Sequence, residues 1–96
     1  MNQKNFYFDL LIEYIKLNTL HDEIFNKFSD KNLRKLSVKE LESIAIGLNK
    51  NFSHHITLTA KDAIERVMRN PNTNYVYNVP EIEMFLNLLR IKYKIQ

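Results

Sequence analysis

The chain has no cysteine and only one glycine among its 96 residues. Without cysteine it can form neither a disulfide framework nor a thiolate metal site, so the fold must depend on packing alone. A single glycine leaves no glycine-rich loop of the kind that binds phosphate groups in nucleotide-dependent enzymes. We therefore expect a small cytoplasmic protein with no cofactor and no bound metal.

Long apolar runs are lacking as well. The stretch from residue 6 to 15 is interrupted by Asp9 and Glu13, and nothing approaches the roughly 18 consecutive apolar residues of a membrane span. The first residues also lack the charged-then-apolar layout of a secretory signal. The sequence therefore predicts no membrane-spanning segment and no secretory leader.

The chain does contain enough apolar material for one core. Six phenylalanines and five tyrosines offer large buried areas, which a chain of this length needs to offset its conformational entropy. A second core would not fit. We predict a single domain over residues 1–96.

Basic residues are concentrated in the later part of the chain. The formal net charge is +3, with acidic residues in excess up to residue 30 and basic residues in excess after it. This distribution favours a polyanionic partner, although ordinary solubilising charges explain it equally well. Enrichment in Asn, Lys and Ile is typical of an AT-rich genome, such as that of a low-GC bacterium or its mobile elements. The basic groups are Lys31/Arg34/Lys35/Lys39, Lys61/Arg66/Arg69 and Arg90/Lys92/Lys94.

Hydrophobic spacing predicts a mainly α fold, a compact bundle of four to five helices. Residues 6–18 are apolar around most of a helical circumference, so this helix should be central. Thr19 is suited to cap a short second helix that reaches Phe28, with one continuous helix as the alternative. Residues 29–32 are expected to form a polar loop.

The clearest helix start lies at residue 37. Ser37 and Glu40 form a capping box, and Leu36 and Leu41 occupy the positions of a hydrophobic staple. Gly47 can adopt the left-handed conformation at little steric cost, so we expect it to end this helix. The apolar positions that then share one face are Val38, Leu41, Ile44, Ala45 and Leu48.

In the stretch ELESIAIGLN at residues 40–49, Ser43 stands four residues before Gly47, and apolar residues flank the glycine. This stretch resembles the first helix and turn of bacterial helix-turn-helix proteins, and residues 37–79 together resemble their winged form. The resemblance implies a recognition segment over residues 49–55 that presents polar side chains to base edges in the major groove. Glu42 and Ser53 depart from the pattern, because the family prefers apolar residues there.

The segment after the recognition region predicts a helix, a turn and a short strand. Thr59 is suited to cap a helix over residues 60–70, and the cluster at 70–74 is typical of a turn. Residues 75–79 alternate as a strand does. In the winged resemblance this strand belongs to a β-hairpin, the wing. Alternatively it pairs with residues 56–58 as a structural ribbon.

A final helix is predicted from Pro80 onward. Proline suits the first helical turn, and Glu81 and Glu83 complement the positive end of the helix dipole. The dipole also explains the basic residues at its other end, although a phosphate contact there is an alternative. The expected buried stripe comprises Ile82, Phe85, Leu86, Leu89 and Tyr93.

The resemblance implies two sets of DNA contacts. One set faces bases and the other engages phosphates or the minor groove, because base contacts specify a sequence and phosphate contacts position the protein. The base-facing set is Lys50, Asn51, Ser53, His54 and His55, and the second set is Lys61, Arg66, Arg69 and Asn74 or Tyr75.

The sequence does not favour an enzyme. His54 and His55 have no companion ligand at metal-binding spacing, and the Glu40/Glu42 and Glu81/Glu83 pairs point apart on a helix. We expect a DNA-binding regulator or accessory factor of a plasmid or phage, with duplex DNA as partner. The alternative is a helical protein-interaction factor, such as a bacteriocin-immunity-like protein or a phage-encoded inhibitor. The oligomeric state is open, and a homodimer is one option.

Overall fold

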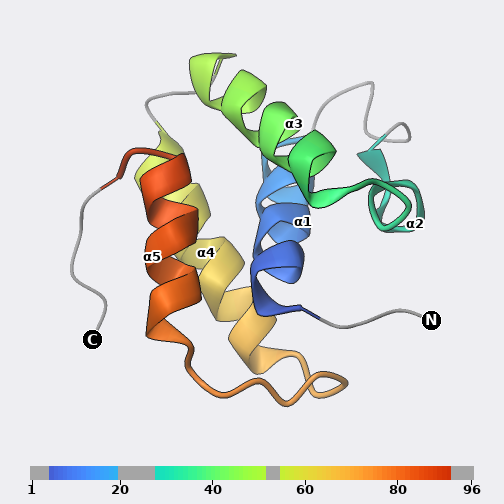
Figure 1. Cartoon of the computed structure of the whole chain (residues 1–96), viewed down its shortest axis with the longest axis vertical. Coiled ribbons are helices and arrows are strands. Elements are labelled where there is room, and N and C mark those ends of the chain that lie inside the picture. The colour runs from blue at the N-terminus through green and yellow to red at the C-terminus, as the bar shows by residue number, and fades with distance from the viewer. Residues whose placement is uncertain (1–4, 20–27, 52–54, 92–96) are drawn as a thin grey trace.

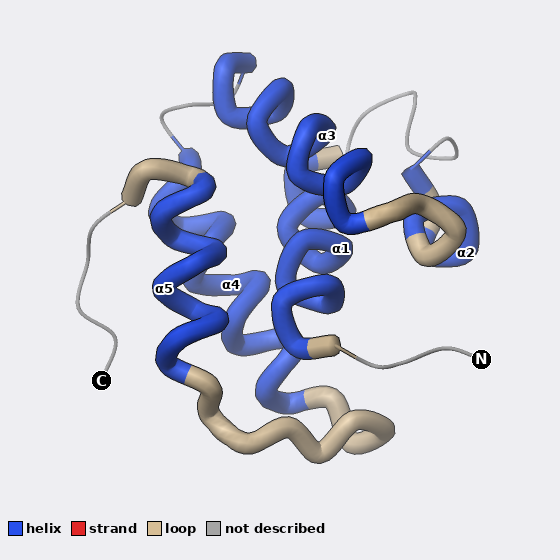
Figure 2. Tube along the Cα trace, in the orientation of Figure 1, coloured by secondary structure: helices blue, strands red, loops and turns tan. Residues whose placement is uncertain are grey.

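Helices make up most of the chain in the computed structural model, which describes residues 5–19, 28–51 and 55–91. Within these ranges no residue belongs to a strand, as Figure 2 shows. Figure 1 shows how the helices are arranged. In chain order they are α1 (Phe6–Asn18), α2 (Asp30–Leu33), α3 (Val38–Asn51), α4 (Ile56–Arg69) and α5 (Val79–Leu88).

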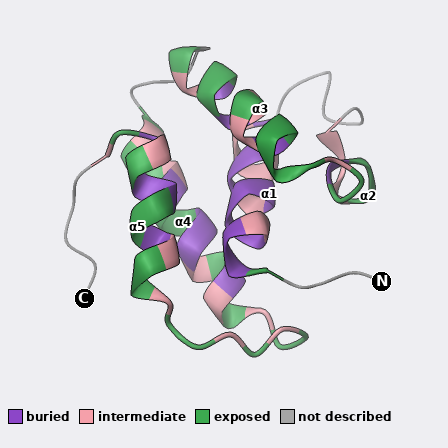
Figure 3. Cartoon of the chain, viewed as in Figure 1, coloured by how far each residue is buried: buried purple, intermediate pink, exposed green. Residues whose placement is uncertain are grey.

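Helix α1 is the centre of the fold, as predicted. It contacts α2, α3, α4 and α5. Leu10, Leu11 and Ile12 are all fully buried, and three consecutive helical positions point in three directions about 100° apart. The helix is therefore covered on several sides, as the purple ribbon of α1 in Figure 3 shows.

Thr19 ends α1, and its predicted role as the cap of a second helix depends on residues outside the described ranges. Its hydroxyl donates a hydrogen bond to the Ile15 carbonyl oxygen at 3.0 Å, and its backbone N–H donates to the same oxygen at 3.1 Å. A threonine bonded back to the preceding turn leaves its hydroxyl oriented toward α1. The rest of the predicted second helix, residues 20–27, lies outside the described residues.

Residues 30–33 form one helical turn, α2, where a polar loop was predicted. The Ser29 hydroxyl accepts a hydrogen bond from the Asn32 N–H at 3.4 Å, which caps the turn. Leu33 is fully buried. The cap and this single buried leucine explain why the polar segment folds as a turn of helix against α1.

The start of α3 agrees with the predicted capping box. The Ser37 N–H donates to Glu40 Oε1 at 2.9 Å, and the Glu40 N–H donates to Ser37 Oγ at 3.2 Å. Leu41, Ala45 and Leu48 are buried and Ile44 is partly buried, which confirms the predicted register. Val38 was expected on the same face, but at the start of the helix it is 38% exposed.

Gly47 does not end α3, which corrects the predicted end of this helix. The helix continues to Asn51, and Gly47 lies inside it, exposed and without a positive φ. The next residue, Leu48, is buried, and Asn49 Oδ1 accepts a hydrogen bond from the Tyr14 hydroxyl. Packing on α1 therefore keeps the chain helical beyond the glycine.

Helix α4 begins at Ile56, earlier than predicted, so the proposed strand at residues 56–58 is wrong. Thr59 lies within the first turn, where its hydroxyl donates to the His55 carbonyl oxygen at 2.9 Å. The helix packs on α1. Its buried residues are Ala60, Ala63, Ile64 and Val67.

The turn predicted at residues 70–74 is confirmed, but no wing follows it. Asn70 Oδ1 accepts a hydrogen bond from the Asn72 N–H at 2.9 Å, and Asn74 has a left-handed φ of 55°. Residues 75–78 are loop. They have no ribbon partner at residues 56–58 because that segment is helical, and Asn78 already caps α5.

Helix α5 starts and ends with well-formed caps. Asn78 Oδ1 accepts a hydrogen bond from the Glu81 N–H at 3.1 Å. At the other end Arg90 adopts a φ of 59°, and the Ile91 N–H donates to the Leu86 carbonyl oxygen at 2.8 Å. These are the features of a Schellman motif. The predicted stripe is confirmed for Ile82, Phe85, Leu86 and Leu89, which are buried, and Tyr93 lies outside the described residues.

Candidate nucleic-acid interface

The tyrosines of α1 are anchored by groups on α3 and α5. The Tyr7 N–H donates to Glu81 Oε2 at 2.8 Å, and its hydroxyl donates to Glu42. The Tyr14 hydroxyl donates to Asn49. Burial, together with the Glu42 carboxylate, raises the pKa of Tyr7 above its usual value, and burial raises the pKa of Tyr14 to about 12. Both hydroxyls therefore stay protonated and serve as donors at neutral pH.

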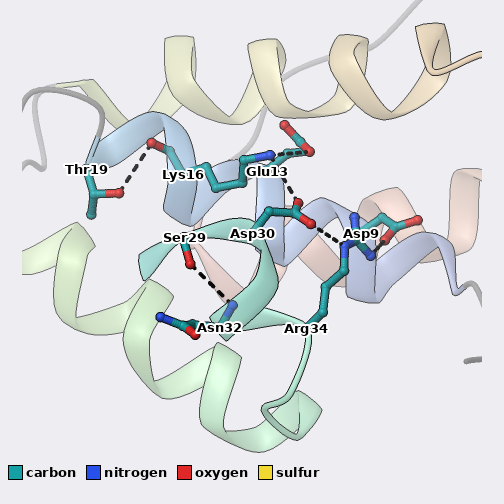
Figure 4. A network of polar contacts seen from close by, with 8 residues as sticks. All are labelled: Asp9, Glu13, Lys16, Thr19, Ser29, Asp30, Asn32 and Arg34. Atoms are coloured by element: carbon teal, nitrogen blue, oxygen red, sulfur yellow. Dashed lines mark hydrogen bonds and ion pairs between the residues drawn. The ribbon is translucent and has the colours of Figure 1, made fainter. Parts of the chain in front are cut away.

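A second polar network surrounds Asp9, whose side chain is only 6% exposed. Its Oδ1 accepts from Arg34 Nη1 at 2.8 Å, and its Oδ2 accepts from the Tyr75 hydroxyl at 2.7 Å. Arg34 Nε also donates to Asp30 Oδ2 at 2.7 Å, and Lys16 Nζ donates to Asp30 Oδ1 at 3.1 Å. Figure 4 shows these pairs between α1 and α2. A buried carboxylate requires such partners, so the network is structural.

The pKa of Asp30 reflects two opposing effects. Partial burial raises it, but hydrogen bonds and charges from Arg34 and Lys16 outweigh burial and hold the pKa below its usual value. The carboxylate of Asp30 is therefore charged at neutral pH and keeps both ion pairs.

Tyr75 belongs to this structural network. Its ring meets Phe6 edge to face at 5.3 Å, and burial and the Asp9 carboxylate raise the pKa of its hydroxyl. The hydroxyl is already committed to Asp9. The bond to Asp9 and the ring contact with Phe6 explain the position of Tyr75 without a contact to the minor groove of DNA, which stays a prediction.

Acidic side chains in the described residues mostly serve the fold. Except for Asp62 and Glu83, each accepts a hydrogen bond or an ion pair from elsewhere in the chain. Of these seven acids, Asp9, Glu13, Asp30 and Glu65 form ion pairs, and the other three accept from neutral groups. The acids used in this way are Asp9, Glu13, Asp30, Glu40, Glu42, Glu65 and Glu81.

Basic side chains show the opposite distribution. Lys16, Arg34 and Arg69 form ion pairs, whereas the other basic residues in the described ranges are exposed and have no acidic partner. Exposed cations without an ion pair therefore outnumber such acids in the described ranges. These free cations are Lys31, Lys35, Lys39, Lys50, Lys61, Arg66 and Arg90.

The predicted base-facing residues do not form a recognition helix in the part of the chain that is described. Lys50 is exposed in the last turn of α3, and Asn51 ends that helix. His55 is exposed at the N-cap of α4. Ser53 and His54 lie outside the described residues.

The second predicted set is spread along α4 and the loop after it. Lys61 and Arg66 are exposed on α4, Arg69 pairs with Glu65 at 2.8 Å, and Asn74 is exposed. Helix α4 has 14 residues, a length of about 21 Å. Lys50 therefore lies near one end of α4 and Asn74 beyond the other, as Figure 1 shows for these segments. His55 and Lys61 therefore lie within two turns of each other at the start of α4, whereas Asn74 lies beyond the other end of that helix.

A surface that the sequence analysis did not assign is the outward side of α3. Lys39 and Lys50 both lie on it, three turns apart, because α3 continues through Gly47. The spacing of Lys39 and Lys50 can be read from the sequence. Because Gly47 was predicted to end the helix, the sequence did not place the two lysines on one helical face.

Two further findings concern the described residues alone. No three His, Asp or Glu side chains among them are grouped so that they could hold a metal ion. None of their helices combines the length and apolar character that crossing a membrane requires.

Comparison of the chain with protein-family models, with curated proteins and with solved structures gives no match. The function must therefore be inferred from the geometry and charge of the described side chains.

Proposed function

We propose that the protein is a non-enzymatic DNA-binding protein that holds duplex DNA through its free cationic side chains. The observation that supports this is that most acidic side chains are bonded within the fold, whereas most basic side chains are not. Acidic side chains are bonded within the fold, whereas Lys31, Lys35, Lys39, Lys50, Lys61 and Arg66 face solvent without acidic partners.

Such cations suit a polyphosphate partner. Each phosphate neutralised by a lysine or arginine releases condensed counterions, and this release supplies much of the affinity of DNA-binding proteins. The proposal needs neither a turn at Gly47 nor a β-hairpin. A role as regulator or accessory factor of a plasmid or phage is supported by the Asn-, Lys- and Ile-rich composition.

The test is duplex binding at two salt concentrations, measured by fluorescence anisotropy. If three phosphates are neutralised, affinity should fall about 40-fold between about 50 and about 200 mM salt. The control variant Asp62→Asn removes one of the two uncommitted acids and should strengthen binding slightly. Absence of binding at the lower salt concentration, or affinity that does not change with salt, would contradict the proposal.

A second candidate function, binding to another protein, is supported by exposed apolar side chains near α5. Val76 is 84% exposed, Val79 49% and Met84 52%, and apolar surface of this kind often marks a protein contact. A homodimer is the simplest case. Analytical ultracentrifugation should then show association that increases with protein concentration and that Val76→Ser weakens. A monomer at all concentrations would contradict the homodimer.

A further inference from the structure

One side of α3 has no partner among the described residues. Its members recur at spacings of three and four, which places them on a single helical face. The opposite face packs against α1. We call the exposed side the outward face of α3, and it comprises Lys39, Ser43, Ile46, Gly47 and Lys50.

The outward face carries two lysines that form no ion pair. Neither Lys39 nor Lys50 has an acidic partner in the described ranges. Of the two acids of α3, Glu42 accepts from the Tyr7 hydroxyl, whereas Glu40 caps the helix start at the Ser37 N–H and stays exposed and charged at the edge of the face. Lysines outnumber acids here, which makes the face complementary to phosphate.

Gly47 adds an observation about shape. A Cβ placed on it would meet no atom within 4 Å, and its φ is not positive. Glycine inside a helix is destabilising relative to alanine, yet neither crowding nor backbone conformation within the chain requires it here. A partner that approaches the helix closely would require it.

From these observations we infer that the outward face of α3 enters the major groove of duplex DNA, an inference that rests on the proposed function. The groove is about 12 Å wide and admits an α-helix. Lys39 and Lys50 stand three turns apart, about 16 Å along the axis, so they reach phosphates at both rims. Between them Ser43 offers a hydroxyl and Ile46 an apolar surface to base edges, and Gly47 lets the helix backbone come close.

Substitution of Gly47 tests the close approach. Gly47→Ala and Gly47→Gln should keep or raise the melting temperature while weakening duplex binding progressively, by about tenfold for glutamine. The matched control is Asn87→Gln, which enlarges an exposed residue of α5 and should leave binding unchanged. Unchanged binding by Gly47→Gln would overturn the groove placement.

Two double variants test the charges. Lys39→Gln/Lys50→Gln and Lys61→Gln/Arg66→Gln each remove two exposed cations from one helix. The α3 pair should reduce affinity at least tenfold more than the α4 pair and lower the salt slope by about two. Equal losses for both pairs would overturn the inference but leave the proposed function standing.

Duplex RNA supplies an independent readout. Its major groove is too narrow for side chains to read, so wild-type binding to duplex RNA should be clearly weaker than to duplex DNA. Equal affinity would overturn the groove placement. If the wild-type protein shows no salt-sensitive binding to duplex DNA at all, the proposed function and this inference both fail.

Discussion

Helix α1 and the outward face of α3 use polar side chains in opposite ways. On α1 the polar groups of Tyr7, Asp9 and Tyr14 are bonded to residues of other segments. On the outward face of α3 neither Lys39 nor Lys50 has an acidic partner within residues 5–19, 28–51 and 55–91.

This difference distinguishes polar side chains that stabilise the fold from polar side chains that are open to a binding partner. The Asp9, Arg34 and Tyr75 cluster has the residue types of a catalytic site, yet every bond in it satisfies a group that burial would otherwise penalise. Exposed lysines carry no such penalty and contribute little to stability. Substitutions around α1 should therefore change stability, and substitutions on the outward face should change binding.

The largest effect is expected for Phe85→Ala. Phe85 is fully buried and meets Tyr14 of α1 edge to face at 5.7 Å, so its removal leaves a cavity beside α1. The free energy of unfolding should fall by about 3–5 kcal/mol, measured by urea denaturation. Asn87→Ala, at an exposed position of the same helix, should change it by less than about 0.5 kcal/mol. Similar losses for both variants would show that α5 does not pack as described.

Asp9→Asn should have the next largest effect. The substitution keeps the size of the side chain but removes the charge that binds Arg34 and Tyr75. Hydrogen bonds to charged groups contribute about 1.5–3 kcal/mol, and a loss of this order is expected in the same denaturation experiment. The control Asp62→Asn removes an exposed, unpaired charge and should be nearly neutral. Equal results for the two variants would mean that the Asp9 network does not stabilise the fold.

Gly47→Ala tests the outward face in the opposite direction. Because the added methyl group meets open space, the free energy of unfolding should rise by about 0.5–1 kcal/mol, measured as an increase in the urea midpoint. Destabilisation would show that the glycine adopts a left-handed conformation and that α3 ends there.

The smallest effect is expected for Asp30→Asn, and it should depend on pH. The pKa of Asp30 lies below the usual 3.8, so its ion pairs stabilise the folded state above that value and lose their contribution as the pH falls through the lowered pKa. Because these pairs are partly exposed, the variant should lose only about 0.2–1 kcal/mol at pH near 7.

Urea denaturation repeated at about pH 2 should give the same stability for wild type and Asp30→Asn. A difference that persists in acid would contradict this account, because Asp30 would then act through something other than its charge.

Local signals explain why most of the fold could be predicted from the sequence. The capping box of Ser37 and Glu40 involves residues only three apart, and the apolar circumference of residues 6–18 indicates a central helix without knowledge of its partners. Such features are encoded within one or two turns. The strand expected at residues 56–58 in the ribbon alternative is wrong for a reason that is not local: these residues are strand-favouring by type, but they lie in a helix that packs on α1.

The errors involve contacts between distant residues. Gly47 was predicted to end its helix because glycine often does so, but the bond between Tyr14 and Asn49, 35 residues apart, holds the following turn helical. The bond from Tyr75 to Asp9, 66 residues away, was likewise invisible in the sequence, and the DNA contact of Tyr75 stays a prediction. The free cations Lys50, Lys61 and Arg66 were identified from charge alone. Lys39 joins Lys50 on one face only once α3 is known to be continuous.

The central position of α1 has a consequence for the order in which the chain is made. Its fully buried Leu10, Leu11 and Ile12 emerge from the ribosome well before α4 and α5, which cover them in the finished fold. At about 5–20 residues per second, this central helix waits several seconds for its partners. A slower translation rate between α1 and α4 would lengthen the time during which its apolar surface is open to aggregation.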